Sequence, residues 1–475
     1  MNPSYVFRSS PMSLTQLIPR STSQYRPIFS SSKECSSTTE HRGNGEAALD
    51  HPRFANPPLS LLPLRMIIRS LCTSVLSSSP LLQPSLRIMA VIAQSENRLL
   101  NPDRNPLLRW LLDKTMYAQF CAGSEETEVQ ETVARLKRIG FTGVVLCYAK
   151  EVPPHEQGQE TQASADRHID HWAKYTLETV RMTEPDDFVA VKFTGAGQLA
   201  RDLLAENHAP NLRLSQCIDN ICQLAQQRGV RLLFDGEHDA LQDGIDNWTL
   251  QYSQKYNTTP GRATIYGTYQ AYKRAMPDKL SQHLIVARDE GFTLGVKLVR
   301  GAYMQSDPRE CFFDTKDDTD MCYDSSAASV LSRRWNDTLR GDGVAEYPQV
   351  SLMLATHNAT SVRRTYAIQN EGRAEAQISF AQLQGMADEI SCELVQMNRR
   401  ADNEMSGADG GAYRHPSTAI LPVYKYMAWG TTGECIKYLL RRVQENRDAV
   451  QRTREDRDAM WRELKRRMKL SVGGE

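Results

Sequence analysis

Residues 231–270 read RLLFDGEHDALQDGIDNWTLQYSQKYNTTPGRATIYGTYQ, and this stretch decides the fold. It begins with the apolar run Arg231–His238, continues through a helical pattern at about 240–257, and ends in a second β-rich run, Ala263–Gln270. A strand, a helix and another strand in this order form a βαβ unit, whose two strands lie parallel in one sheet. Buried parallel strands are typically near-continuous apolar runs, as these are.

The same alternation continues on both sides of this unit. Eight β-rich runs, each followed by a helical pattern, occur between residues 140 and 450: Thr142–Ala149, Phe188–Gly195, Arg231–His238, Ala263–Gln270, Thr293–Tyr303, Val350–His357, Gln377–Gly385 and Val423–Gly430. Eight βα units in series predict an α/β protein with a TIM-like (β/α)8 barrel over 141–450.

The segments outside the barrel have a different composition. No acid precedes Glu34, and arginines are scattered through Ser/Thr/Pro-rich sequence, so 1–100 is predicted to be a mitochondrial transit segment and disordered leader. A disordered tail without an addressing role is the alternative. Prolines and arginines interrupt the apolar stretch at 57–93, which therefore does not predict a membrane span.

A helical arm is predicted over 101–140, and a charged amphipathic helix over 451–475. On that last helix Met460, Trp461, Leu464 and Met468 share one face among basic residues. This helix either docks on anionic lipid or packs on the barrel.

Bulk composition excludes some functions. The 475 residues carry 57 basic and 57 acidic side chains, which argues against a nucleic-acid binder. The ten cysteines include no Cys-x-x-Cys pair, so we expect reduced intracellular thiols and no metal site. Residues 305–348 form a long acidic connection with a helical pattern near 325–340. It is either a lid or a mobile excursion, and it lacks the glycine and closing glutamate of a calcium loop.

Reactive side chains gather at the C-terminal ends of the predicted strands, where TIM barrels hold their active sites. They are Lys192, Asp235, Glu237, Gln270, Arg300, Thr356, His357 and Tyr426. The two carboxylates Asp235 and Glu237 face the same side, as an acid–base pair or as partners for cations. Lys297 and Arg300 leave their strand on different faces, so one can face the pocket while the other meets the following loop.

Two motifs have more than one interpretation. Gly195–Ala200 nearly matches a dinucleotide-binding fingerprint, but a barrel instead favours a tight loop there. Ala355–Asn358 ends a strand ahead of a helix, which suits either a ligand phosphate or an ordinary helix cap.

An arginine pair lies in the last apolar helix pattern, Tyr438-Leu-Leu-Arg441-Arg442. Guanidinium groups stay charged and present planar sets of donors, so two of them near tyrosines suit a small carboxylate. Lys192, at the end of an apolar strand, is a candidate third cation, or else a structural partner for Asp235 or Glu237.

The chain resembles the proline dehydrogenase (proline oxidase) family, most closely its fungal mitochondrial branch. The motifs that carry the resemblance are Leu-Phe-Asp-Gly-Glu at 233–237, Tyr-Gln-Ala-Tyr at 269–272, Lys-Leu-Val-Arg-Gly-Ala-Tyr at 297–303, Ala-Thr-His-Asn at 355–358, Leu-Gln-Gly-Met at 383–386 and Tyr438-x-x-Arg441-Arg442-x-x-Glu445-Asn446. They occur in order over about 115–450. The first strand departs from the pattern, because Leu146-Cys147 stands where an Asp is expected before Tyr-Ala.

The resemblance implies a distorted barrel whose eighth helix lies over the mouth, with FAD as cofactor. Asp235 and Lys297 would be the catalytic residues, Lys297 beside the flavin N5 and Asp235 supporting the substrate-binding groups. The substrate-binding residues would be Lys192, Arg441 and Arg442 for the proline carboxylate, with Leu383, Tyr426 and Tyr438 around the ring. Those in contact with FAD would be Gly236, Gln270, Arg300, Gly301, Ala302, Thr356, His357 and Glu445.

The implied reaction is oxidation of L-proline to 1-pyrroline-5-carboxylate, with a hydride passing from C5 to the flavin and electrons then passing to a quinone. A cationic site disfavours the protonated amine, so no strong acid or base is needed. The implied location is the matrix side of the mitochondrial inner membrane, with peripheral membrane contact. A hydroxyproline dehydrogenase, which Tyr426 would disfavour by crowding a 4-hydroxyl, and a catalytically idle regulatory relative are the alternatives.

Overall fold

The structure is a computed structural model, and it describes residues 56–76, 79–95, 97–150, 161–304, 306–407, 420–445 and 450–472. Its centre is a closed barrel of parallel strands in chain order. The strands are β1 Gly143–Tyr148, β2 Phe188–Val191, β3 Arg231–Phe234, β4 Ile265–Gln270, β5 Leu294–Val299, β6 Val350–Ala355, β7 Gln377–Leu383 and β8 Val423–Trp429. All eight predicted strands are therefore present, and the predicted (β/α)8 fold is confirmed.

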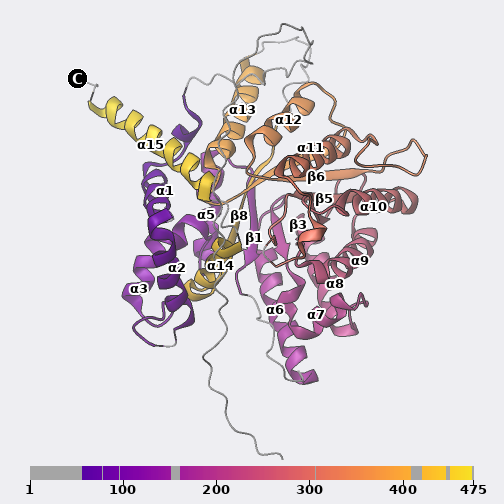
Figure 1. Cartoon of the computed structure of the whole chain (residues 1–475), viewed down its shortest axis with the longest axis horizontal. Coiled ribbons are helices and arrows are strands. Elements are labelled where there is room, and N and C mark those ends of the chain that lie inside the picture. The colour runs from indigo at the N-terminus through magenta and orange to yellow at the C-terminus, as the bar shows by residue number, and fades with distance from the viewer. Residues whose placement is uncertain are drawn as a thin grey trace, which may run out of the picture. The chain divides into compact units, whose positions relative to one another are not determined.

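Helices surround this barrel (Figure 1). They are α5 Glu126–Ile139, α6 Gln162–Met182, α7 Gln198–Ala205, α8 Leu212–Arg228, α9 Asp239–Tyr256, α10 Met276–Glu290, α11 Lys316–Ser332, α12 Ala359–Asn370, α13 Asp388–Gly407 and α14 Thr432–Glu445. Because the helices cover the outer faces of the strands, almost every strand residue is buried.

Closure depends on the pairing of the first and last strands, in which Val145 lies opposite Tyr426. Successive side chains of a strand point to opposite faces. Tyr424 and Tyr426 therefore face the barrel interior, whereas Lys425 points outward to α13. There its ammonium lies 2.7 Å from the Asp388 carboxylate. The same alternation sends Asp235 and Lys297 inward, where they meet.

The N-terminal boundary differs from the prediction. Within 1–100, residues Pro58–Leu61 form the short helix η1, and α1 Leu64–Leu76 and α2 Ser79–Gln94 follow. Ile67 is fully buried in the main core, so the structured part of the chain begins before residue 100. The prolines that interrupt this stretch are compatible with helices because several lie at or just before helix starts. Residues 1–55 lie outside the described part, so the transit segment remains a prediction.

The helical arm over 101–140 contains α3 Pro106–Leu112, a π-helical turn η2 Asp113–Tyr117 and a short α4 Ala118–Phe120 ahead of α5. At the other end of the chain, α15 Val450–Val472 packs against α1, η1 and α13. Met460 is buried there, which supports packing on the protein for this helix, whereas Trp461 and Met468 are exposed.

The acidic connection at 305–348 holds the 3-10 turn η4 Arg309–Cys311 and α11. The helix expected at 325–340 was placed wrongly, since α11 begins at Lys316. A capping box of Thr315 and Asp318 starts it earlier, where the acids also favour a helix N-terminus.

The near-match to a dinucleotide fingerprint is a tight turn. A closed barrel lacks the doubly wound sheet that such a site needs. Gly197 has φ 105°, and a Cβ there would approach the Cβ of His168 to 2.9 Å, so glycine is required by packing against α6.

Candidate active site at the barrel mouth

An ion pair lies inside the barrel at the C-terminal ends of the strands. The Lys297 ammonium of β5 is 2.5 Å from the Asp235 carboxylate, which directly follows β3. The Tyr426 hydroxyl of β8 donates to the other carboxylate oxygen at 3.1 Å. Asp235 and Lys297 are each less than a tenth exposed. One carboxylate thus holds an ammonium and a phenol in fixed positions.

Asp235 is charged because several cations surround it. Burial disfavours the carboxylate, but Lys297, Lys192 and Arg442 outweigh burial and hold the pKa of Asp235 below its usual range. Cations therefore outnumber this one anion around Asp235. The remaining cations suit an anionic ligand group.

The helix α14 contributes Tyr438, Arg441 and Arg442 to the same cluster. Tyr438 lies at the centre of a cationic group: the Lys192 ammonium is 5.5 Å from its ring centroid, and the guanidinium carbons of Arg441 and Arg442 are at 6.0 and 5.3 Å. The ring is buried, and burial raises the pKa of Tyr438 although the charges of Arg442 and Lys192 lower it. The structure therefore brings the predicted substrate-binding cations together around one ring.

The second carboxylate, Glu237, has a different role. Thr194, which follows β2, donates to Glu237 from its backbone N–H at 3.2 Å and also from its hydroxyl. Burial raises the pKa of Glu237 against these hydrogen bonds and the charge of Lys192. Asp235 pairs with Lys297 and Glu237 with Thr194, so neither geometry is that of an acid–base pair.

Two residues of this cluster escaped the sequence analysis. Cys147, near the end of β1, is buried in the barrel-interior cluster against which Tyr426 packs, and Tyr303 is among the groups that raise the pKa of Lys192. Cys147 could have been predicted from its place near a strand end, because Lys192 was predicted to be a site residue for that reason. Tyr303 lies four residues past β5, and its position depends on the path of the loop.

Several predicted cofactor residues lie beside this cluster. Gln270 ends β4, and its amide nitrogen contacts the Gln242 side chain at 3.1 Å and the Glu237 carbonyl at 3.4 Å. Within the described residues, its buried Oε1 has no hydrogen-bond partner. An unsatisfied buried acceptor at the mouth fits a ligand that carries a donor.

A second group lies at the ends of β5, β6 and β7. The Arg300 guanidinium donates to Asp320 of α11 at 2.7 Å, Thr356 at 2.6 Å and Ser361 at 2.8 Å. Arg300 thus meets the acidic connection, while Lys297 faces the pocket, as their spacing predicts.

The last residue of β7 is tied to the loop that follows β6. The backbone N–H of Leu383 donates to the His357 ring at 3.1 Å. Thr356, His357 and Leu383, three of the predicted site residues, are therefore neighbours at this edge of the mouth.

The lack of a side chain at Gly301 allows the Tyr272 ring to approach its backbone closely. Its φ is 141°, and a Cβ there would lie 1.9 Å from the Tyr272 ring. The Tyr272 hydroxyl also accepts from the backbone of Tyr303, whose own hydroxyl donates to the Gly236 carbonyl at 3.3 Å. Gly236, Gly301 and Ala302 thus belong to one packed corner of the mouth. The Glu445 side chain is outside the described part.

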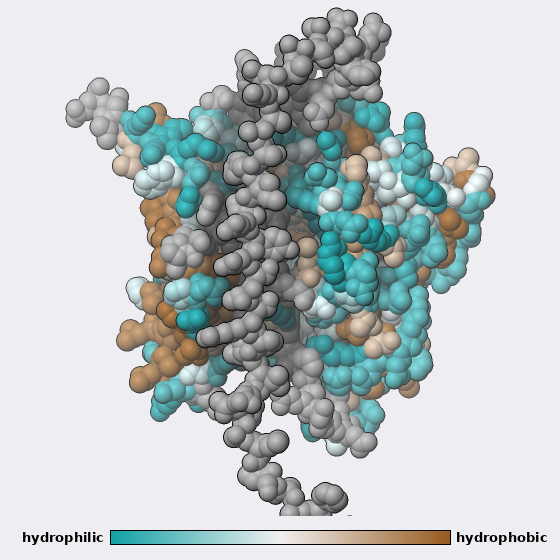
Figure 2. Space-filling model, in the orientation of Figure 1, coloured by the Kyte–Doolittle hydropathy of each residue, from teal (hydrophilic) through white to brown (hydrophobic). Residues whose placement is uncertain are grey.

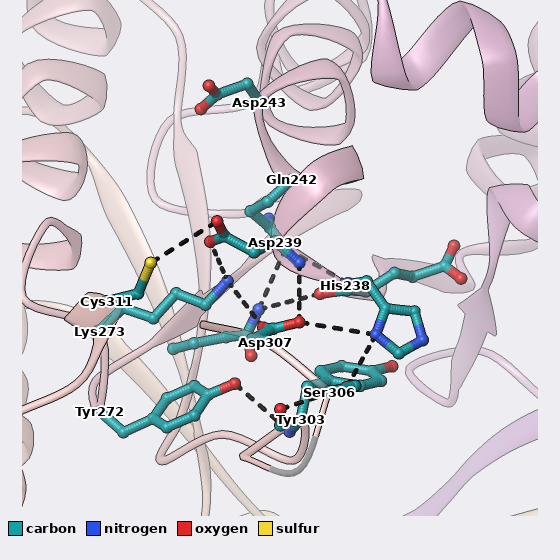
Figure 3. A network of polar contacts seen from close by, with 12 residues as sticks. His238, Asp239, Gln242, Asp243, Tyr272, Lys273, Tyr303, Ser306, Asp307 and Cys311 are labelled. Atoms are coloured by element: carbon teal, nitrogen blue, oxygen red, sulfur yellow. Dashed lines mark hydrogen bonds and ion pairs between the residues drawn. The ribbon is translucent and has the colours of Figure 1, made fainter. Parts of the chain in front are cut away.

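A polar network fastens the loops around that corner (Figure 3). Lys273, after β4, lies 2.7 Å from the Asp239 carboxylate and 3.3 Å from that of Asp307, which follows β5. Asp307 also accepts from the Asp239 backbone at 3.1 Å, and His238 contacts Ser306 at 3.1 Å. These contacts therefore link residues that follow three neighbouring strands.

Other sequence predictions concern the rest of the chain. The described cysteines are free thiols. Among the described residues no group of three or more His, Cys, Asp and Glu side chains is placed to hold a metal ion. No described helix is long and apolar enough to cross a bilayer.

The fold and the mouth together define a (β/α)8-barrel protein with a buried, cation-rich site for an anionic ligand. A family model described as "Proline dehydrogenase" matches residues 129–455. The chain belongs to the proline dehydrogenase family.

Individual relatives support this family assignment. "Probable proline dehydrogenase, mitochondrial" of Schizosaccharomyces pombe is 26% identical over 77% of this chain and 81% of its own. "Proline dehydrogenase 1, mitochondrial" of Caenorhabditis elegans is 32% identical over 52% of this chain, but the match covers only 37% of that protein. The crystal structure of proline utilization A from Bdellovibrio bacteriovorus, inactivated by N-propargylglycine, matches 80% of this chain and 38% of its own at TM-score 0.58. At 15% identity, this last match supports the fold alone.

Proposed function

We propose that this protein is an FAD-dependent proline dehydrogenase that oxidises L-proline to 1-pyrroline-5-carboxylate. The observation that carries the proposal is the gathering of Lys192, Arg441 and Arg442 around the Tyr438 ring, beside the Lys297–Asp235 pair. Family membership supports it. A cationic group next to aromatic walls suits a small molecule that has one carboxylate and an apolar ring.

In this proposal the three cations bind the proline carboxylate. Arginine favours such a role because its planar donors match the two carboxylate oxygens. Tyr426, Tyr438 and Leu383 would enclose the pyrrolidine ring. Tyr426 is suited to this because its hydroxyl is already held by Asp235, so its ring has a fixed position.

The catalytic contribution of these residues is orientation and charge. FAD, when bound, would supply the hydride-accepting chemistry. Lys192, Arg441 and Arg442 would hold the substrate, and the positive surroundings would keep its amine neutral. Asp235 would keep Lys297 in place at the reacting end of the site. Fixed positions of this kind lower the entropic part of the barrier.

The cofactor would lie along the edge that runs from β4 to β7. Gln270 would accept a donor there through its unsatisfied Oε1. Arg300, Thr356 and His357 would line the β5–β7 end, and Gly236, Gly301 and Ala302 the packed corner. Glu445 completes the proposed set.

The partners and location follow from the family. We propose a quinone as electron acceptor, and a mitochondrial location on the matrix side of the inner membrane with peripheral contact. Relatives are named mitochondrial. Of the proposed domains, 1–55 would hold the transit segment, 101–140 the helical arm, 141–450 the FAD-binding barrel and 451–475 the C-terminal helix.

A flavin spectrum tests the activity. The purified protein should be yellow, and anaerobic addition of L-proline should bleach the visible flavin absorbance. Colourless protein with no flavin released on denaturation would refute the proposal. Yellow protein that proline leaves unbleached would instead point to the regulatory alternative.

The same assay addresses hydroxyproline. Because Asp235 fixes the Tyr426 hydroxyl at 3.1 Å, this ring is poorly placed to move away from an additional 4-hydroxyl. L-Proline should therefore reduce the flavin faster than 4-hydroxyproline when both are added to one preparation. Faster reduction by hydroxyproline would favour a hydroxyproline dehydrogenase.

A further inference from the structure

The N-terminal helices present apolar side chains to solvent. Ile68 and Val75 of α1, Ile88 and Val91 of α2, and Leu107 and Trp110 of α3 are each at least 46% exposed. Apolar residues gather along the left edge of Figure 2, over the region where Figure 1 labels these three helices. Contiguous apolar surface of this kind typically marks an interaction site.

The two longer helices are apolar on two opposite faces. On α2, Leu86 and Met89 are buried and pack near α14, while Ile88 and Val91 point away. A surface helix needs one apolar face for the core, and its other face is ordinarily polar. The second apolar face of α2 therefore needs an apolar environment outside the protein.

The charged residues of α1 and α2 indicate which apolar environment covers these faces. From Asn56 to Ser95 there is no acidic residue, and the only charged side chains are Arg65, Arg69 and Arg87. Arg65 and Arg87 are exposed, whereas Arg69 turns inward and donates to Gln119 at 3.0 Å. Asp103 and Asp113 flank α3, but both accept hydrogen bonds from the start of α14. Apolar side chains flanked by arginines, with no acid on α1 or α2, complement a lipid surface with anionic headgroups. A protein partner with an apolar surface would not require the absence of acids.

We propose that α1, α2 and α3 form a membrane-docking face that lies in the interface of an anionic phospholipid bilayer. Ile88, Val91 and Leu107 enter the upper acyl region, Trp110 lies at headgroup depth, and Arg65 and Arg87 contact lipid phosphates. The docking is peripheral, since none of the described helices spans a bilayer. Because α2 packs against α14, the face lies one helix away from the barrel mouth.

Vesicle flotation of the full-length protein tests the docking. We expect it to float with vesicles of phosphatidylcholine mixed with an anionic phospholipid, and to float much less with phosphatidylcholine alone. The double variant Ile88→Asp/Leu107→Asp should lower the bound fraction on anionic vesicles at least tenfold. Arg65→Gln/Arg87→Gln should lower it several-fold and reduce its dependence on salt.

A matched control separates this face from general surface hydrophobicity. Met321 and Leu212 lie on α11 and α8 and are 62% and 76% exposed, close to the 61% and 78% of Ile88 and Leu107. Met321→Asp/Leu212→Asp should float like the unaltered protein. Equal binding by both double variants, or no binding to either vesicle by the unaltered protein, would overturn the proposal.

A second copy of the chain is the other possible occupant, and light scattering detects it. If the unaltered protein is a dimer that Ile88→Asp/Leu107→Asp makes monomeric, the face is a protein interface and the proposal fails. Bleaching of flavin by proline in solution is measured on the same samples, and it does not depend on lipid. Failure of docking and failure of the proposed oxidation are therefore distinguishable.

Discussion

Tyr438 shows how one residue position organises the site. Its ring lies within 6.0 Å of the charged groups of Lys192, Arg441 and Arg442, which come from two elements far apart in sequence. Each cation gains from the negative face of the ring, by about 0.5–2 kcal/mol in typical cases. The aromatic ring thus offsets part of the repulsion among the cations, and Asp235 offsets another part.

Replacing Arg442 by Met tests the carboxylate clamp. The Arg442→Met variant keeps much of the side-chain volume but loses a charge-assisted contact, which costs about 2–5 kcal/mol when one partner of a buried pair is removed. We expect the KM for proline to rise roughly a hundredfold with a smaller change in kcat. Steady-state kinetics with a soluble acceptor measures both values.

The control for this variant is Arg363→Met. Arg363 makes two hydrogen bonds to Glu393 on the outer helices, at 3.0 and 3.1 Å, away from the mouth. The KM for proline of the Arg363→Met variant should match that of the unaltered protein. A KM for Arg442→Met within about twofold of the unaltered value would place the carboxylate site elsewhere.

The C-terminal helix α15 is held by polar contacts at two places. Arg467 donates to the carbonyls of Leu59, Ser60 and Leu62 and pairs with the buried Glu463. Near the start of the helix, the Asp456 carboxylate accepts from the backbone of Ala387 at 3.2 Å. The first contact joins the two ends of the described chain, and the second places a carboxylate close to Asp388.

Asp456 should make the stability of the packing of α15 on the protein depend on pH. Burial raises the pKa of Asp456 to about 6, above its value of about 3.9 in an unfolded chain. Between these values the folded state binds more protons than the unfolded state, so this group lowers stability as pH rises from about 4 to 6. The loss is complete above pH 6 and amounts to at most roughly 3 kcal/mol.

The Asp456→Asn variant removes this loss, because the amide oxygen can still accept from Ala387. We expect it to raise the free energy of unfolding at pH 8 and to have little effect at pH 4, as measured by urea titration. Asp458→Asn is the control, since Asp458 is exposed on the same helix. An equal gain for Asp456→Asn at both pH values would contradict the account.

The N-terminal helices complete the hydrophobic core of the protein. Leu59, Leu62 and Ile67 are buried in the cluster that also contains β1 and β5 residues. Met89 is buried in a separate cluster with α14. Each such side chain contributes about 1.5–3 kcal/mol through burial. Residues 58–94 thus stabilise the barrel and support the helix that carries Arg441 and Arg442.

Two truncations test this contribution. A chain that begins at Asn56 should unfold at the same temperature as the full-length protein. A chain that begins at Asn101 should aggregate or unfold at a temperature at least about 10 °C lower, because it exposes the apolar surfaces that η1, α1 and α2 cover. Differential scanning calorimetry compares them. Equal unfolding temperatures for both chains would mean that residues 56–100 are dispensable.

The strand pattern could be predicted from sequence because it is local. Each of the eight runs shows its burial in its own composition, and eight βα units leave the barrel as the natural way to cover both faces. Asp235 was recognisable because it directly follows an apolar run, Lys297 through its odd spacing from Arg300, and Tyr426 through its place in the last apolar run. The start of α11 was misplaced because its amphipathic signal is weak, and its capping box was overlooked.

The sequence by itself thus determined the barrel, the rim on which reactive residues lie and, through its motifs, the family. Only the tertiary structure decided that α14 meets β2 at Tyr438, that Tyr272 fills the space beside Gly301, and that Cys147 and Tyr303 join the site. It also decided that residues 58–94 pack on the core. The physical reason is that periodicity shows which faces are apolar, whereas the partner of each face depends on how distant segments share the limited space around the barrel.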